Sequence, residues 1–303
     1  MVIRGIALGG LAVRRRVDTV VEPARLLGWV QIAMALAALA TLPVYNLTFS
    51  VMEALMRGLA RNETGYLLFN LSGAAIAALV MLPATFFAGM TLPLLTGALL
   101  RKGAGEAAIG EVYAANTLGA IAGVVLAVHF GLPVLGLKGA LIAASLIDLA
   151  LGVLLLGAFF PRRRLALGAA GAAALFLGVA LSVELDAHKM TAGVFRHGEL
   201  AASRDAAILY RKDGKTATVH LVRYAEATSL RTNGKSDGSI NLDPEGARGS
   251  DEVTMVLTAA LPLALKPDAK SAAVIGIGTG LTTHTLLQSL DLDRVETVEI
   301  ESA

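Results

Sequence analysis

Three glycines, a threonine and a glutamate near the C-terminus have types and spacing that suit the binding of a nucleoside. Gly276, Gly278 and Gly280 alternate with single residues, and Thr279 fills the last gap. Glycines in such a turn let the backbone approach a ligand closely. Glu299 follows Gly280 by nineteen residues, where an acid can bind the two hydroxyls of a ribose. We therefore predict a cofactor site made of Gly276, Gly278, Thr279, Gly280 and Glu299.

The segments around these residues predict the elements that would position them. Ala272–Ile275 is short, apolar and β-branched, Leu281–Leu290 is compatible with a helix, and Val295–Ile300 reads as a second strand. A strand, a glycine turn, a helix, a strand and a terminal acid are typical of the start of a nucleotide-binding α/β domain. Alternation points Glu299 and Glu301 to the same side of the second strand, so Glu301 is an alternative ribose ligand.

Two other interpretations of the loop stay open. The glycines could form a tight β-to-α turn without a ligand, because a lone Gly-x-Gly is weak evidence. An NAD site would place its third glycine at position 281, which is Leu281, whereas Gly280 fits the shorter spacing of a methyltransferase-like loop.

The composition predicts a membrane protein. Hydrophobic residues make up 55% of the chain and charged residues 17%, against about 45–50% and 25% in soluble domains. The net charge of +2 makes no case for a nucleic-acid partner. Cysteine is absent, which excludes disulfides and thiol catalysis, and the histidines lack the spacing of metal ligands. The chain predicts no metal site.

Long apolar runs fill the first part of the chain. We predict a transmembrane helical domain at residues 1–183, with about five spans, since each run approaches the roughly 20 residues that a crossing needs. The expected spans are Leu26–Phe49, Tyr66–Leu100, Ala114–Phe130, Gly139–Phe160 and Leu165–Val183.

The N-terminal run Met1–Val13 is too short to cross. We interpret it as the end of a partial span, because a cleavable signal peptide, the alternative, carries its charges before the apolar run. In the Tyr66–Leu100 run, Pro83 and Pro93 indicate either one kinked helix or two half-spans. The basic clusters, among them Arg14–Arg16, place one side in the cytoplasm. Five crossings then put residues after Glu184 outside, where nucleotides are scarce.

Two features of the spans could be functional. Asp148 lies within an apolar run, and an intramembrane acid indicates a proton or substrate relay; the alternative is a hydrogen bond within the bundle, for instance through Ser145. Small residues are expected where helices pack closely. The glycines that we expect there are Gly119, Gly123, Gly168 and Gly171.

The remainder has the composition of a soluble protein. We predict a connector and a small antiparallel β-sheet domain at residues 184–250, with strands at Ala207–Arg211, Thr216–Arg223 and Thr228–Thr232. Asn233-Gly234 is favourable hairpin chemistry. Residues 251–303 would be the incomplete beginning of a Rossmann-like, class I methyltransferase-like α/β domain, opened by a helix at Asp251–Leu265.

Several motifs, in this order, resemble those of membrane proteins fused to a spermidine-synthase-like domain, the polyamine aminopropyltransferase-like family. Each motif is weak alone, but together they cover most of the chain from Leu26 onward. They are Tyr113–Gly123 (YAANTLGAIAG), Gly131–Gly139 (GLPVLGLKG), Ile208–Val219 (ILYRKDGKTATV), Leu230–Lys235 (LRTNGK), the glycine loop and Val298–Glu301 (VEIE).

The resemblance implies a cofactor, decarboxylated S-adenosylmethionine or S-adenosylmethionine, and aminopropyl or methyl transfer to a small-molecule amine. It also implies that the chain is truncated at both ends. The family's catalytic aspartate would fall after Ala303, so no catalytic residue is assigned and we expect this fragment to be inactive. Membrane lipids are the other expected partner, and the bacterial inner membrane the expected location.

The chain departs from the family pattern where an amine would bind. The family's loop aspartate falls on Thr279, its Tyr-Gln pair on Thr254 and Met255, and its later histidine on Ala260. A polyamine calls for carboxylates and amide oxygens, so these changes disfavour a polyamine more than a nucleoside. A membrane transporter with a degenerate or regulatory nucleoside-binding C-terminal domain is the alternative function, and a purely structural anchor is a third.

Overall fold

The structure, a computed structural model, describes residues 1–14, 19–198, 200, 206–243 and 245–303. Arg15 and Arg16 of the first basic cluster, and residues 199 and 201–204 of the connector, lie outside the described residues. The chain forms two compact units, Met1–Leu185 and Asp186–Ala303.

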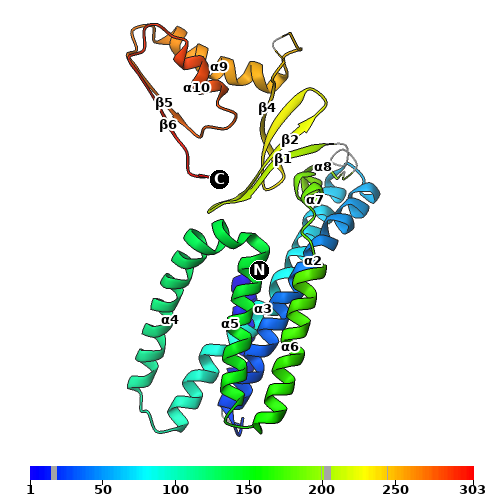
Figure 1. The fold of residues 1–303 in the computed structure, drawn as a ribbon, viewed down its shortest axis with the longest axis vertical. Helices are drawn as coiled ribbons and strands as arrows, with labels where there is room; N and C mark the ends of the chain where they lie inside the picture. Colours follow the sequence, from blue (N-terminus) through cyan, green and yellow to red (C-terminus); the bar gives the residue numbers. More distant parts are fainter. Residues whose placement is uncertain (15–18, 199, 201–205, 244) are drawn as a thin grey trace. The chain divides into compact units, whose positions relative to one another are not determined.

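The first unit is helical (Figure 1). Its core brings together residues from four helices, including Val13, Leu27 and Leu94. The elements in chain order are α1 (Val2–Arg14), α2 (Pro23–Gly58), α3 (Glu63–Arg101), α4 (Ala107–Leu126), the π-helix η1 (Ala127–Leu135), α5 (Gly136–Leu156) and α6 (Arg162–Ser182).

Four helices in the described residues are long and apolar enough to cross a membrane, which confirms the membrane character. They are α2, α3, the stretch Ala107–Leu156 that runs through α4, η1 and α5, and α6. The expected linker Gly131–Gly136 is helical as far as Leu135, because η1 runs through it. The two spans predicted on either side of the linker fall largely in α4 and α5. Gly136 has φ 68°, a left-handed conformation that glycine adopts without steric cost, and the chain changes direction near it (Figure 1).

The α3 segment is one continuous helix despite its two internal prolines. It spans Glu63–Arg101 with Pro83 and Pro93 inside. This confirms the prediction of a single helix and not the alternative of two half-spans. Its N-terminus is capped by Asn62, whose Oδ1 accepts the backbone N–H of Gly65 at 2.8 Å.

Close helix contacts fall on glycines other than those expected. A Cβ at Gly89 of α3 would lie 2.1 Å from the carbonyl oxygen of Ile6 in α1, and one at Gly152 of α5 would lie 2.9 Å from that of Gly28 in α2. The prediction for four other glycines was wrong, because nothing in the described chain lies within 4 Å of a Cβ built there: Gly119, Gly123, Gly168 and Gly171. Gly119 and Gly123 are exposed on α4, and Gly168 and Gly171 line a cavity that α6 forms with α2 and α5.

The second unit starts with two short helices and a small antiparallel sheet, which confirms the predicted sheet. The short helices are α7 (Ala187–Thr191) and α8 (Val194–His197). The sheet has the order β1-β2-β3-β4, with strands β1 (Ala207–Asp213), β2 (Thr218–Tyr224), β3 (Ala227–Thr232) and β4 (Lys235–Asn241).

The fourth strand, β4, was not among the three expected. Its sequence is polar and lacks apolar alternation, so it gives little strand signal. The turn before it is the better predictor: Asn233 and Gly234 have φ 49° and 80°, as a type I′ hairpin turn requires, and Thr232 pairs directly with Lys235.

The chain ends in a helix and a βαβ unit. Strands β5 and β6 pair in parallel, as the crossover through α10 requires. The elements are α9 (Ser250–Leu265), β5 (Ser271–Ile275), α10 (Leu281–Leu287) and β6 (Arg294–Val298). Helix α10 ends three residues before the predicted Leu290 and β6 two residues before Ile300, so Glu299 and Glu301 follow the strand instead of alternating within it.

Candidate functional site

The glycine loop joins β5 to α10 with three left-handed residues. Gly276, Gly278 and Gly280 have φ 90°, 52° and 82°, and nothing lies within 4 Å of a Cβ built at any of them. Glycine is needed there because of backbone conformation and not because of crowding. The loop therefore keeps open space beside its backbone.

Glu299 lies against this loop. Its Oε2 accepts the backbone N–H of Ile277 at 2.8 Å, and its Oε1 accepts those of Ile300 and Glu301 at 2.8 and 3.0 Å. The hydrogen bonds from the N–H groups of Glu301 and Ile277 lower the pKa of Glu299. A carboxylate has about four acceptor positions, so the exposed, ionised side chain of Glu299 keeps capacity for a ligand hydroxyl.

Thr279 of the glycine loop contacts Met255 of α9. Its Oγ1 donates a hydrogen bond to Met255 Sδ of α9 at 3.0 Å, and Thr282 Oγ1 donates to the carbonyl oxygen of Met255 at 3.1 Å. A Cβ added at Gly238 of β4 would lie 3.2 Å from Thr279 Cγ2 and 3.4 Å from Met255 Sδ. Thr279 and Met255 are therefore neighbours, and together with Gly238 they offer a thioether, a hydroxyl and a methyl group. Charged amines are bound by carboxylate and amide oxygens instead.

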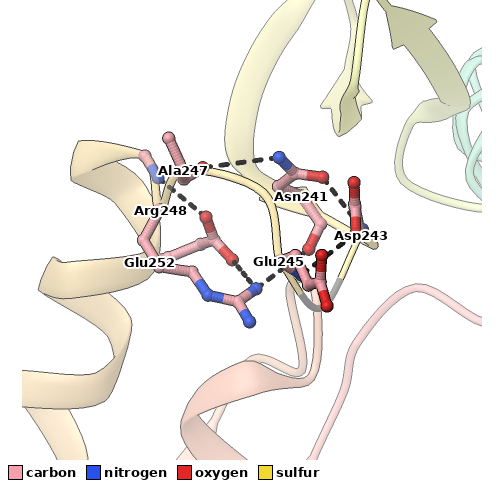
Figure 2. A network of polar contacts seen from close by, with 7 residues as sticks. Asn241, Asp243, Glu245, Ala247, Arg248 and Glu252 are labelled. Atoms are coloured by element: carbon pink, nitrogen blue, oxygen red, sulfur yellow. Dashed lines mark hydrogen bonds and ion pairs between the residues drawn. The ribbon is translucent and has the colours of Figure 1, made fainter.

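A polar network fixes the start of α9, which carries Met255 (Figure 2). Glu252 is only 5% exposed; its Oε2 accepts the N–H of Gly249 at 2.7 Å and its Oε1 pairs with Arg248 at 3.2 Å. Arg248 also donates to the carbonyl oxygen of Asn241 at 3.1 Å. The hydrogen bond from Gly249 is the main reason that the pKa of Glu252 is lowered.

Sequence reasoning missed this network, although a signal for it exists. Glu252 lies three residues after the N-cap residue Gly249, which is the capping-box position. A second tie comes from Asp251, whose Oδ2 accepts both the N–H and the hydroxyl of Ser239 in β4 at 3.0 Å. Together these bonds join α9 to the sheet.

Glu301 has a different partner from Glu299. Its Oε2 accepts the N–H and the hydroxyl of Thr216 at 2.7 and 2.8 Å, in the turn between β1 and β2. Burial alone would raise the pKa of Glu301, but the hydrogen bonds from Thr216, Ala217 and Lys215 outweigh it and lower the pKa to about 2. Glu301 therefore binds the β1–β2 turn, whereas Glu299 binds the glycine loop.

One histidine is fully buried in the sheet. His220 of β2 is 0% exposed and pairs across the strands with Arg211 and Arg231. Among the described residues neither of its ring nitrogens has a hydrogen-bond partner. Burial, with the charge of Arg211 next, lowers the pKa of His220 to about 4. It is therefore a neutral residue of the sheet interior at neutral pH.

In the helical unit, Asp148 does not form a hydrogen bond with Ser145, which was the predicted alternative to a relay function. Ser145 Oγ donates to the carbonyl oxygen of Leu141 in its own helix at 2.8 Å, because a serine within a helix readily bonds four residues back. No hydrogen bond to the Asp148 carboxylate is found in the described part of the chain. Within the described residues there is also no cluster of three or more metal-ligating side chains.

The chain has no recognised relatives in the comparisons. No protein-family model matches it, and neither the curated proteins nor the solved structures include a match.

Proposed function

We propose that this chain is an integral membrane protein, resident in a bacterial inner membrane, whose C-terminal segment binds S-adenosylmethionine or its decarboxylated form. The segment would begin a Rossmann-like domain of the spermidine-synthase-like type, and the reaction would be transfer of an aminopropyl or methyl group. The side chains that would contact the nucleoside are Glu299 and Thr279, with the backbone of Gly276, Gly278 and Gly280.

The observation that carries the proposal is the position of Glu299. Its carboxylate lies within hydrogen-bonding distance of the loop, 2.8 Å from the Ile277 nitrogen, and it is exposed. A strand-end acid beside an open glycine loop is the arrangement in which a ribose is held by its two hydroxyls. The parallel pairing of β5 and β6 around α10 supports a Rossmann-like domain.

The contact between Thr279 and Met255 restricts the class of substrate that could accept the transferred group. A doubly charged amine needs acceptor oxygens, and this pair supplies only a hydroxyl and a thioether. We propose an acceptor with less charge than a polyamine, and we expect no turnover of putrescine with decarboxylated S-adenosylmethionine.

Isothermal titration calorimetry of the chain in lipid nanodiscs tests nucleoside binding. We expect saturable binding of S-adenosylmethionine to the unmodified chain. Glu299→Gln should lower the affinity by up to about tenfold, because a neutral amide accepts ribose hydroxyls less strongly than a carboxylate. Glu299→Gln keeps an acceptor for the Ile277 N–H. Glu296→Gln on β6 is the matched control, expected to bind normally; no binding to the unmodified chain contradicts the proposal.

The alternative is a membrane transporter whose C-terminal domain has a regulatory role. Asp148, a carboxylate of α5 without a hydrogen bond in the described residues, favours it, because an intramembrane acid is costly unless it has a function. Uptake of an amine into liposomes by the purified chain, abolished by Asp148→Asn, would support the transporter; nucleoside binding without uptake would support the transferase.

A further inference from the structure

The helical unit contains a polar cavity close to one end of the bundle. It has a volume of about 370 Å³ and lies between α2, α3 and α4, within the roughly 300–1,000 Å³ range of small-molecule pockets. Four polar side chains line it: Gln31 of α2, Thr91 of α3, and Glu111 and Asn116 of α4. Their positions are near the start of α2, the end of α3 and the start of α4, which is the same end of the three helices.

Three of these polar side chains have acceptor oxygens that the described chain leaves unpaired. Gln31 Oε1 is buried without a hydrogen-bond partner among the described residues. The Thr91 hydroxyl donates to the carbonyl oxygen of Ala88 at 2.7 Å, so its oxygen is left to accept. No hydrogen bond or ion pair to Glu111 is found in the described part of the chain. A buried unpaired acceptor costs free energy, and a ligand that supplies donors would offset that cost.

The charge of the lining defines the chemistry of the ligand. Glu111 is the one ionisable side chain among the lining residues, and it lies four residues into α4, about 6 Å along the helix. The Glu111 side chain is exposed and has no protein partner in the described part of the chain, so a cationic group suits it. A bare metal ion does not fit, because there is no second carboxylate in the lining and the cavity is far larger than an ion.

The rest of the lining is aliphatic and includes Leu27, Leu92 and Leu95. These side chains suit the carbon chain of a ligand, while the oxygens of Gln31, Thr91 and Glu111 suit a group with several N–H donors. A protonated amine has three such donors and one positive charge. We propose that this cavity binds a protonated alkyl amine, with its ammonium group at Glu111 and Gln31 and its carbon chain against Leu92 and Leu95.

The flanking charges place this site near the cytoplasmic surface. Arg25 is in the first turn of α2, and Arg101 and Lys102 are at the end of α3. The positive-inside rule assigns that end of the helices to the cytoplasm. The cavity therefore takes a cytoplasmic amine, at a site separate from the glycine loop.

Equilibrium dialysis of the full chain in nanodiscs with radiolabelled n-butylammonium tests the proposal, and n-butanol serves as the neutral probe of the same length. We expect saturable retention of n-butylammonium but not of n-butanol. Glu111→Gln should weaken retention about tenfold or more, as loss of a charged hydrogen bond implies. Glu111→Asp should restore part of it, and Gln31→Leu should weaken it several-fold.

Two controls separate this site from other effects. Glu106→Gln removes a carboxylate five residues earlier, outside the cavity lining, and should bind normally; Glu299→Ala should also bind normally, so failure of the nucleoside proposal leaves this result unaffected. Elution of each variant as a single species reports on folding. Absence of saturable retention, equal retention of n-butanol, or equal retention by a folded Glu111→Gln variant would overturn the proposal.

Discussion

The Glu299 carboxylate and the Ile277 backbone nitrogen are 2.8 Å apart, which ties the first acid after β6 to the glycine loop 22 residues earlier. The loop and the acid therefore form one structural unit before any ligand binds. A ligand that meets a preformed site loses less free energy to ordering.

Removal of the Glu299 carboxylate should loosen the glycine loop. In Glu299→Ala the N–H of Ile277 loses its acceptor, and we expect its hydrogen exchange to accelerate about threefold or more, the effect of one ordinary hydrogen bond. Hydrogen-exchange mass spectrometry of the peptide that contains the loop measures it. Glu296→Ala is the control, and unchanged exchange at Ile277 would show that the contact contributes nothing to loop order.

The pair Met255 and Thr279 should determine whether a diamine binds. We expect the double variant Met255→Gln, Thr279→Asp to gain binding of putrescine, about tenfold or more over the unmodified chain, because it introduces a charge and an amide oxygen side by side. Calorimetry compares it with both single variants. If the double variant binds putrescine no better than the unmodified chain, positions 255 and 279 do not determine diamine binding.

The stability of the four-stranded sheet should fall as the pH is lowered, because of His220. Its pKa is about 4 in the folded protein against an ordinary value of 6.5, so the unfolded state binds a proton first. Stability is fully present above pH 6.5 and is lost down to about pH 4, by on the order of 3 kcal/mol in total. Below that window both states are protonated and the loss stops growing.

Hydrogen-exchange mass spectrometry of β2 peptides across this pH range, corrected for intrinsic exchange, measures the effect. His220→Leu should remove the dependence within the window, and His284→Gln, on α10 outside the sheet, should keep it. A sheet whose stability is constant from pH 7 to pH 4 would contradict the assignment to His220.

Glycine substitutions should distinguish packed from unpacked helix faces. Gly152→Ala places a methyl group against the Gly28 carbonyl oxygen and Ile32, and we expect a loss of about 1–3 kcal/mol. Gly119→Ala meets nothing within 4 Å and should be neutral or raise stability by up to about 1 kcal/mol, since alanine favours helix. Thermal unfolding in one detergent compares the two, and equal effects would be inconsistent with the α2–α5 packing.

Patterns that depend on neighbouring residues were predictable from the sequence. Apolar runs located the membrane helices, and Asn233-Gly234 located a hairpin, because hydropathy and turn conformation are local properties. The π-helix through Pro133 was not predictable in this way, and β4 was indicated only by the turn before it. A polar strand such as β4 depends on its pairing with β3, which outweighs its weak local preference for a strand.

The candidate site also has some features that the local sequence predicts and others that it does not. The glycine positions and the proximity of an acid follow from a spacing that is visible in the chain. The different partners of Glu299 and Glu301 do not, because they depend on where β6 ends. Likewise the contact between Thr279 and Met255 joins residues 24 positions apart, and nothing in either segment alone indicates it.

The unequal lengths of the helices have a consequence for the membrane surface. Asn46 of α2 donates to the carbonyl oxygen of Glu184, just after α6 ends at Ser182, so the end of α6 is level with Asn46. The 21 residues of α6 extend for about 31 Å, close to the roughly 30 Å hydrocarbon thickness. A bilayer that matches α6 therefore leaves α2 from Asn46 to Gly58, about 18 Å of helix, and the facing start of α3 as a projecting helical stalk in the aqueous phase.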